Sequence, residues 1–229
     1  MRLTRCLVLL VVLIPLPSWA QVTDNFTGTN GTALPTYSAN WGSFASLRIN
    51  DAQIFGNGVN SNGAVPTGDQ YKGRTWANDH YSQLTVITAI TAGDEFWAVI
   101  VRADTGGTER TGYFGGADIA NLGHARYSIW KWVANVRTQL ATHASQTIAT
   151  NDMVKLSVVG STLTLNVNST DILTVSDSAI TSGAAGLYLW GDSATTTYMD
   201  SFVGADISSG GGSGAPSGTR TLSLMGAGR

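Results

Sequence analysis

The chain has 229 residues, 43% of them hydrophobic and only 12% charged, with a formal net charge of −2. Nucleic-acid binding requires a basic face that neutralises phosphates, and 13 basic against 15 acidic side chains argue against such a partner. A chain of this length can bury a core large enough to hold one domain together without disulfide bonds.

Residues 1–20 have the pattern of a secretory signal peptide. Two arginines are followed by the apolar run 7–16, and small residues at Ser18 and Ala20 precede the expected cleavage position. A membrane anchor is the alternative, but the run is about half of the roughly 20 residues that a spanning helix needs. We therefore expect a secreted protein, extracellular or periplasmic, with no membrane span. Cleavage removes the only cysteine, Cys6, and two of the 13 basic residues, which leaves 11 against 15 acidic ones.

Between residues 22 and 207 the apolar runs are short, alternate with polar residues and are rich in Val, Ile, Thr, Tyr and Trp, which indicates β-strands. Strands are predicted at 22–26, 47–49, 52–56, 73–77, 80–91, 95–103, 112–117, 126–133, 136–142, 153–159, 162–168, 171–176, 184–191 and 197–205. Tight turns are expected at Asn135, Gly160 and Ser169, and the Gly- and Asn-rich residues 56–68 are predicted to form a loop. Many strands without a helical pattern predict an all-β fold, an antiparallel two-sheet β-sandwich.

The two ends of this region resemble one another. Asp-Asn-Phe at 24–26 is echoed by Asp-Ser-Phe at 200–202, each within an apolar-anchored strand pattern. We expect these segments to pair in one sheet and to close a single domain over residues 21–207. Gly and Ser dominate 208–218, which predicts a flexible linker, and the tail 219–229 is expected to be disordered or to act as a short docking segment.

Several weak motifs follow one another in a recognisable order. They are Asp24-Asn25-Phe26, Ala39-Asn40-Trp41, FWAVIVR at 96–102, the strand pair at 126–140, the hairpin at 151–163 and the closing strands at 183–207. This order resembles the concanavalin A-like lectin/glucanase superfamily, in particular the laminin-G-like jelly-roll domains of exported bacterial proteins. The resemblance implies two antiparallel sheets, often with a carbohydrate-binding concave face. The superfamily includes lectins, glycosidases, lyases and structural modules, so the fold does not settle the activity.

The acidic residues do not favour a glycosidase. Retaining glycosidases need two carboxylates about 5 Å apart, which on this fold usually project from one strand face. The only glutamates, Glu95 and Glu109, lie in different segments, with no acidic residue two or four positions away. An aspartate pair from separate strands stays open as an alternative, as does a lyase built on Tyr127 with Lys131 and Arg126, or on His80 with Tyr81. No catalytic residue is assigned. The histidines are expected at the surface or at loop edges: His80, His124 and His143.

Aromatic residues give the better indication of a site. In the run RYSIWKWV, Trp130 and Trp132 share one strand face and lie about 6.6 Å apart along the strand, whereas Tyr127 lies on the other face. Sugar rings stack on exposed aromatic faces, so the two tryptophans are a candidate platform; the alternative is that both fill the core between the sheets. The candidate ligand-binding residues are Trp130, Trp132, Tyr127 and Trp190.

A calcium ion is a possible cofactor, with no cofactor as the alternative. Calcium takes several oxygen ligands, often aspartates and loop carbonyls. The candidate metal ligands are Asp24, Asp192 and Asp200, because their strands are expected to lie near one another. A second oxygen-rich segment contains Asn57, Asn60, Asn62 and Asp69. Ordinary solvated turn residues are the competing interpretation of both groups.

Three functions are compatible with the sequence. The first is an exported, non-catalytic module that binds a carbohydrate, such as a glycan or polysaccharide, or another cell-surface polymer. The second is a structural protein of the envelope or extracellular matrix, acting through self-assembly or a surface protein partner. The third is a polysaccharide hydrolase or lyase. Neither a nucleic-acid partner nor a membrane span is expected.

Overall fold

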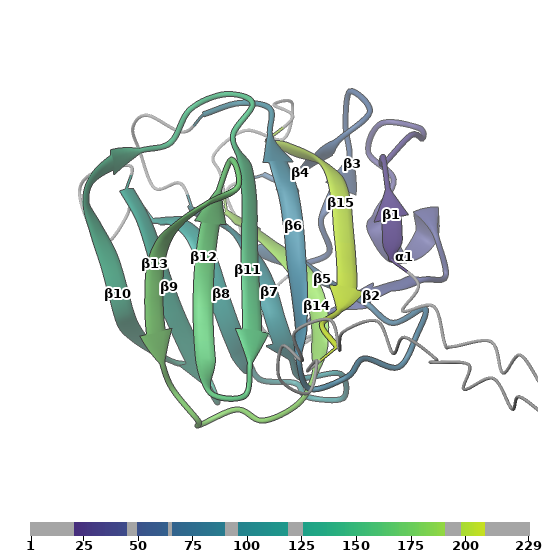
Figure 1. The fold of residues 1–229 in the computed structure, drawn as a ribbon. Helices are drawn as coiled ribbons and strands as arrows, with labels where there is room; N and C mark the ends of the chain where they lie inside the picture. Colours follow the sequence, from purple (N-terminus) through teal and green to yellow (C-terminus); the bar gives the residue numbers. More distant parts are fainter. Residues whose placement is uncertain are drawn as a thin grey trace, which may run out of the picture.

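The computed structural model describes residues 21–44, 50–63, 66–89, 96–118, 126–190 and 198–208. Nearly all regular structure is β, apart from one short helix, α1 (Leu34–Tyr37). The strands form two antiparallel sheets that are stacked face to face (Figure 1). The predicted all-β, two-sheet sandwich is therefore confirmed.

The first sheet, sheet A, has the strand order β13-β12-β11-β6-β15-β4-β3, with β1 pairing on β15. Its strands are β1 (Val22–Asp24), β3 (Gln53–Ile54), β4 (Val59–Asn60), β6 (His80–Val86), β11 (Met153–Val159), β12 (Thr162–Val167), β13 (Thr170–Ser176) and β15 (Met199–Asp206). The second sheet, sheet B, has the order β10-β9-β8-β7-β14-β5-β2. Its strands are β2 (Trp41–Ser43), β5 (Thr67–Tyr71), β7 (Phe96–Ala103), β8 (Gly112–Asp118), β9 (Arg126–Val133), β10 (Val136–Thr147) and β14 (Ala184–Trp190).

The main core lies between the two sheets. Sheet A follows the pattern of a sheet with one buried face, because every second residue of β6 and β11 is buried. Sheet B differs at its centre, since all positions of β7 are buried. Trp97, Val99 and Val101 face the inter-sheet core, so the residues between them must be covered on the other side of the sheet.

The two ends of the domain meet in sheet A, as the similar end motifs predict. β1 pairs with β15 (Figure 1), and in this pairing Asp24 lies opposite Phe202. The Asp24 carboxylate accepts hydrogen bonds from the Tyr37 hydroxyl at 2.9 Å and from the Trp41 indole at 2.8 Å. The Trp41 ring in turn packs against Phe26 and Phe202, with ring centroids 5.6 and 4.8 Å away. Trp41 therefore packs beside the terminal strands.

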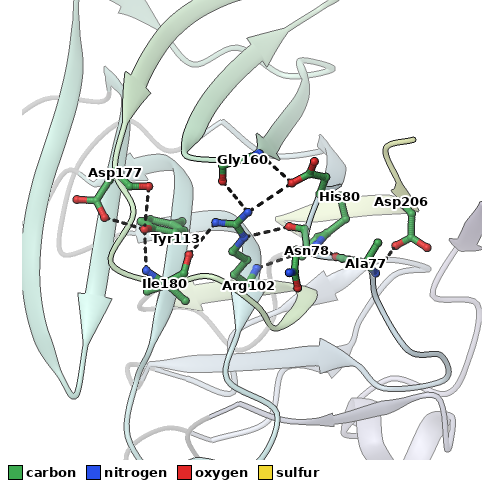
Figure 2. A network of polar contacts seen from close by, with 10 residues as sticks. Ala77, Asn78, His80, Arg102, Tyr113, Gly160, Asp177, Ile180 and Asp206 are labelled. Carbon is green, nitrogen blue, oxygen red and sulfur yellow. Dashed lines mark hydrogen bonds and ion pairs between the residues drawn. The ribbon is translucent and has the colours of Figure 1, made fainter. Parts of the chain in front are cut away.

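A buried arginine connects the sheets at one end of the sandwich (Figure 2). Arg102, on β7 of sheet B, is 3% exposed. Its guanidinium donates hydrogen bonds to the carbonyl oxygens of Asn78 at 3.0 Å, Ile180 at 2.7 Å and Gly160 at 2.7 Å. Gly160 lies in the turn between β11 and β12, so this side chain holds a sheet A hairpin against sheet B.

His80 belongs to the same network, and its expected surface position is wrong. The side chain is fully buried, with Nδ1 2.7 Å from the carbonyl oxygen of Ala77 and Nε2 accepting the backbone N–H of Arg102 at 3.1 Å. These contacts assign the proton to Nδ1 of a neutral ring. Burial, and less strongly the charge of Arg102, lower the pKa of His80 below its ordinary value.

The strand predicted at 73–77 is also wrong. These residues form bends and irregular backbone without a strand partner. Their polar groups bind elsewhere: the Trp76 indole donates to the Tyr71 carbonyl oxygen at 2.8 Å, and the Ala77 N–H donates to the Asp206 carboxylate at 2.9 Å. The β-like composition of this segment reflects a packed loop.

The predicted loop at 56–68 contains β4 and the start of β5, so it is more ordered than its composition indicates. The strand predicted at 47–49 and the segments at 1–20 and 209–229 lie outside the described residues. The leader, most of the linker and the tail therefore stay predictions. None of the described residues belongs to a helix that is long and apolar enough to cross a membrane.

Candidate functional site

A second apolar layer covers the outer face of sheet B, the face turned away from sheet A. It consists of Phe44, Phe96, Ala98, Ile100, Ala103, Phe114, Trp130 and Tyr188. The register of the strands brings these side chains together, because Phe114 lies opposite both Ile100 and Trp130. This layer explains why β7 is buried on both faces.

The rings of this layer hold one another in place. Phe96 packs edge-to-face on Trp130 at 5.1 Å and on Tyr188 at 4.9 Å, and Phe114 packs edge-to-face on Tyr188 at 5.5 Å. Such aromatic pairs contribute roughly 0.5–1.5 kcal/mol each beyond the area they bury. The result is a preformed aromatic floor on a rigid sheet.

A cleft of about 450 Å³ opens on this aromatic layer. Its lining residues are Pro66, Phe96, Arg110, Trp132, Asn135, Arg137, Tyr188 and Trp190. Phe96 and Tyr188 are buried, whereas Trp132 and Trp190 pack on the layer and stay partly exposed. The cleft thus offers two accessible indole rings above buried ones.

Arg110 is fixed in this cleft by the turn between β9 and β10. Ala134 and Asn135 form that turn, with φ values of 48° and 68°, the left-handed conformations that two-residue hairpin turns require. The Asn135 side-chain oxygen accepts the backbone N–H of Arg110 at 2.9 Å and its Nε–H at 3.4 Å. The guanidinium carbon lies 3.8 Å from the Trp132 ring centroid, and Nη1 lies 3.3 Å from the Tyr188 hydroxyl.

The lining of the cleft is electropositive. It contains two arginines, Arg110 and Arg137, and no acidic side chain among the described residues. The whole chain carries a net charge of −2, so the positive lining is a local feature.

A larger cavity of about 700 Å³ lies at the end of the sandwich beside the Arg102 network. Its arginines already have protein partners: Arg102 donates to three carbonyl oxygens (Figure 2), and Arg74 forms an ion pair with Asp206. Tyr113, next to this network, donates to Asp177 at 2.7 Å and accepts the N–H of Ile180 at 3.0 Å. These groups hold loops together, and the cleft on sheet B is the better candidate site.

The cleft contains two of the four predicted ligand-binding residues, Trp132 and Trp190. Trp130 is fully buried in the layer below, where it supports Phe96. The alternative that Trp130 and Trp132 fill the core between the sheets is wrong, because both lie on the outer face of sheet B.

Tyr127, the fourth predicted ligand-binding residue, lies on the opposite face of β9. It is fully buried between the sheets, and its hydroxyl donates to the Asp152 carboxylate at 2.6 Å. Burial and this hydrogen bond raise the pKa of the Tyr127 hydroxyl. A ligand on the outer face cannot reach this side chain, so Tyr127 does not belong to the candidate site.

The arginines and Asn135 of the cleft are absent from the predicted site. Asn135 is predicted only as a turn residue, and Arg110 has no motif around it. Arg110 is 25 positions from Asn135 and 78 from Tyr188. The one available signal is the strand pairing that places Gly112 opposite Trp132, which brings the start of β8 next to the tryptophan.

Two of the three predicted calcium ligands, Asp24 and Asp200, lie within the described residues. The Asp24 carboxylate already accepts three protein hydrogen bonds, from the Phe26 N–H at 2.8 Å and from the Tyr37 and Trp41 side chains. Calcium needs six to eight oxygen ligands, and among the described residues no three His, Cys, Asp or Glu side chains gather into a metal-binding group. Asp192 lies outside the described residues. Asp24 and Asp200 therefore do not fit a calcium ion by themselves.

The second oxygen-rich segment gives no clearer metal site. Asp69 is fully buried on β5, where one carboxylate oxygen accepts the backbone N–H of Ala52 at 2.8 Å. Burial raises the pKa of Asp69 well above its ordinary value, which disfavours the charged carboxylate that a metal ion needs.

Comparisons with known proteins agree with the architecture. No protein-family model and no curated protein matches the sequence. Among solved structures, the carbohydrate binding module CBM66 from Bacillus subtilis superposes with a TM-score of 0.53 at 14% identity, over 73% of this chain and 93% of that one. The exoplasmic/lumenal domain of VIP36 in its Ca²⁺-bound form gives a TM-score of 0.55 at 10% identity, over 82% and 90% of the two chains. The same domain with Ca²⁺ and Man3GlcNAc gives 0.53 at 10% identity, over 77% and 87%. At these identities the likeness concerns the fold alone, and it confirms the two-sheet jelly-roll sandwich that the sequence resemblance implies.

Proposed function

We propose that this chain is an exported, non-catalytic carbohydrate-binding module whose ligand occupies the cleft on sheet B. The observation that carries this proposal is the pair of partly exposed indoles, Trp132 and Trp190, on a floor of buried rings. Sugar rings have apolar C–H faces that stack on aromatic rings, while their hydroxyls need polar partners at the rim. Asn135 and the two cleft arginines provide such partners.

The two tryptophans differ in what they offer. The Arg110 guanidinium already covers one face of the Trp132 ring. Trp190 makes no aromatic stacking or cation–π contact with the described residues. We therefore assign stacking of the sugar ring to Trp190 and positioning of Arg110 to Trp132.

The structural neighbours support this proposal at the level of the fold. One is a carbohydrate-binding module, and VIP36 has been solved with a mannose-containing glycan. One fold hosts many activities, so the cleft and not the fold of these neighbours carries the proposal. Export rests on the predicted leader at 1–20, which makes a secreted location the natural setting for a glycan ligand.

Binding is favoured over hydrolysis by the side chains in the cleft. Glycosidases need a pair of carboxyl groups on either side of the scissile bond. The described lining residues include no Asp, Glu or His. They can orient a sugar, but they cannot supply the acid and base of a hydrolytic reaction.

A role of calcium in binding can be tested by removing the ion with EDTA. The VIP36 domain is Ca²⁺-bound in its solved structures. The cleft residues need no metal for the contacts proposed above, and the prediction of a site at Asp24, Asp192 and Asp200 stays untested. EDTA is expected to leave the affinity of the cleft unchanged.

Retention on a panel of soluble and insoluble polysaccharides, with and without EDTA, tests the proposal. Trp190→Ala should weaken retention on the bound polymer by roughly 10- to 100-fold, the effect of losing one stacked ring and its buried area. Tyr81→Ala is the matched control, because Tyr81 is a partly exposed aromatic residue on sheet A. Release of new sugar ends would show that the protein cleaves the polymer, which would refute a non-catalytic role. No retention on any polymer would refute the proposal and favour assembly with a protein partner.

A further inference from the structure

We propose that the sugar bound in the cleft carries a carboxylate, as in a uronate-containing polysaccharide, and that Arg110 pairs with it. This inference rests on the proposed function and names the chemical class of its ligand. It follows from the position of Arg110, the partners of the other buried cations and the charge of the lining.

Arg110 is held in one orientation, but its contacts do not use all of its hydrogen-bond donors. Asn135 fixes its backbone and Nε, Trp132 supports the guanidinium plane, and Nη1 lies near the Tyr188 hydroxyl. Its Nη2 has no hydrogen-bond partner among the described residues. An arginine that is ordered in advance loses little side-chain entropy when it binds an anion.

Three other cations of the domain have acidic partners. Arg74 pairs with Asp206, Lys131 lies 2.5 Å from Asp177, and the Arg102 guanidinium lies 3.6 Å from Asp79. Arg110 has no carboxylate partner among the described residues. The aromatic surroundings lower the local dielectric, so an incoming anion would interact with this cation more strongly than in open solvent.

The shape of the cleft favours an anionic sugar over a simple anion. Partly exposed Trp190 provides an apolar surface for a ring, and Arg110 and Arg137 provide positive charge beside it. A uronate carries its carboxylate directly on the sugar ring, so one residue can stack on the indole and present a planar carboxylate to the guanidinium fork. A sulfate ester shares the charge but extends farther from the ring, and it is the competing source of an anion.

The test compares acidic polymers with their own neutral counterparts. The purified protein is titrated with polygalacturonate, alginate and hyaluronan, with the carboxyl-reduced form of each, with neutral polysaccharides and with dextran sulfate. We expect at least one acidic polymer to bind roughly 10- to 100-fold more tightly than its carboxyl-reduced form, the usual contribution of a charge-assisted hydrogen-bonded pair. Affinity should fall as salt is raised.

Each other outcome has a separate meaning. Equal binding of an acidic polymer and its reduced form, or binding of neutral polymers alone, overturns the carboxylate inference and leaves carbohydrate binding intact. Binding of dextran sulfate without any carboxylated polymer assigns the anion to a sulfate and overturns the inference in this form. Failure of every polymer to bind refutes the proposed function together with the inference.

Variants separate a specific pair from general electrostatics. Arg110→Lys keeps the charge but loses the planar fork, and Arg110→Gln loses both; each should weaken binding of the acidic polymer about tenfold or more and leave the reduced polymer unaffected. Lys155→Gln, on sheet A, removes the same charge outside the cleft and should have no effect. Equal losses in Arg110→Gln and Lys155→Gln would overturn the inference. If the Arg110 variants fail to fold, Arg137→Gln removes the other positive charge of the cleft, which lies on strand β10. Its effect on binding of the acidic polymer is then compared with that of Lys155→Gln.

Discussion

Replacing Arg102 by alanine should be among the most damaging single changes in the domain. The substitution removes three hydrogen bonds from a guanidinium that is 3% exposed, and it leaves the carbonyl oxygens of Asn78, Gly160 and Ile180 without these donors. Hydrogen bonds to charged groups contribute roughly 1.5–3 kcal/mol each. The adjoining cavity of about 700 Å³ admits water, which restores part of this hydration. We therefore expect a loss of about 3–5 kcal/mol in the free energy of unfolding.

Urea denaturation followed by tryptophan fluorescence measures this loss, and calorimetry should show a midpoint lower by roughly 10 °C. Arg102→Lys keeps a positive charge that can reach only part of the network, so it should fall between the wild type and Arg102→Ala. Lys155→Ala, a surface substitution on sheet A, should change stability by no more than about 0.5 kcal/mol. A loss below about 1 kcal/mol in Arg102→Ala would mean that water replaces the guanidinium, and the claim that it holds the two sheets together would fail.

Three further changes test other parts of the structure. Tyr127→Phe removes the 2.6 Å hydrogen bond to Asp152 and should cost about 1–2 kcal/mol in urea denaturation without changing glycan retention; a change in retention would contradict its place between the sheets. Gly116→Ala should destabilise the domain by about 2 kcal/mol or more, because a Cβ there would clash with the backbone of Trp97 on the neighbouring strand; an unchanged thermal midpoint would contradict that register. The lowered pKa of His80 means that the unfolded chain binds the proton more readily, so the stability it contributes is present above pH 6.5 and is lost as the pH falls towards the lowered pKa. Thermal midpoints measured from about pH 7.5 to 5 should show this decline, and His80→Gln, which keeps an acceptor for the Arg102 N–H, should flatten it; equal slopes in both proteins would exclude His80 as the cause.

The strand pattern predicts much of the fold because alternation is a local property of the sequence. It separates Trp130 and Trp132 from Tyr127 correctly, since neighbouring positions of a strand point to opposite faces. Alternation does not tell which face meets the other sheet. In β7 both faces are apolar, and only the assembled structure shows that Phe96 and Trp97 belong to different layers.

Tertiary contacts account for the features that the sequence did not predict. His80 is polar and titratable, so its composition suggests the surface, but a carbonyl oxygen at Ala77 and the Arg102 N–H satisfy both ring nitrogens inside the protein. The segment at 73–77 has strand-like residues, yet Asp206 binds its backbone from a distant strand. Local propensity describes these residues correctly and is overruled by partners far along the chain.

The contrast between two arginines shows how the structure separates stability from recognition. Arg102 and Arg110 lie eight positions apart in the sequence, Arg102 near the end of β7 and Arg110 in the connection between β7 and β8. Arg102 is buried and donates to three carbonyl oxygens, so removing it should cost stability. Arg110 lies over the Trp132 ring in an open cleft with no carboxylate partner among the described residues, so its charge is available to a ligand. The residue type is the same in both cases, and it is the set of partners around each guanidinium that makes one a structural contact and the other a binding group.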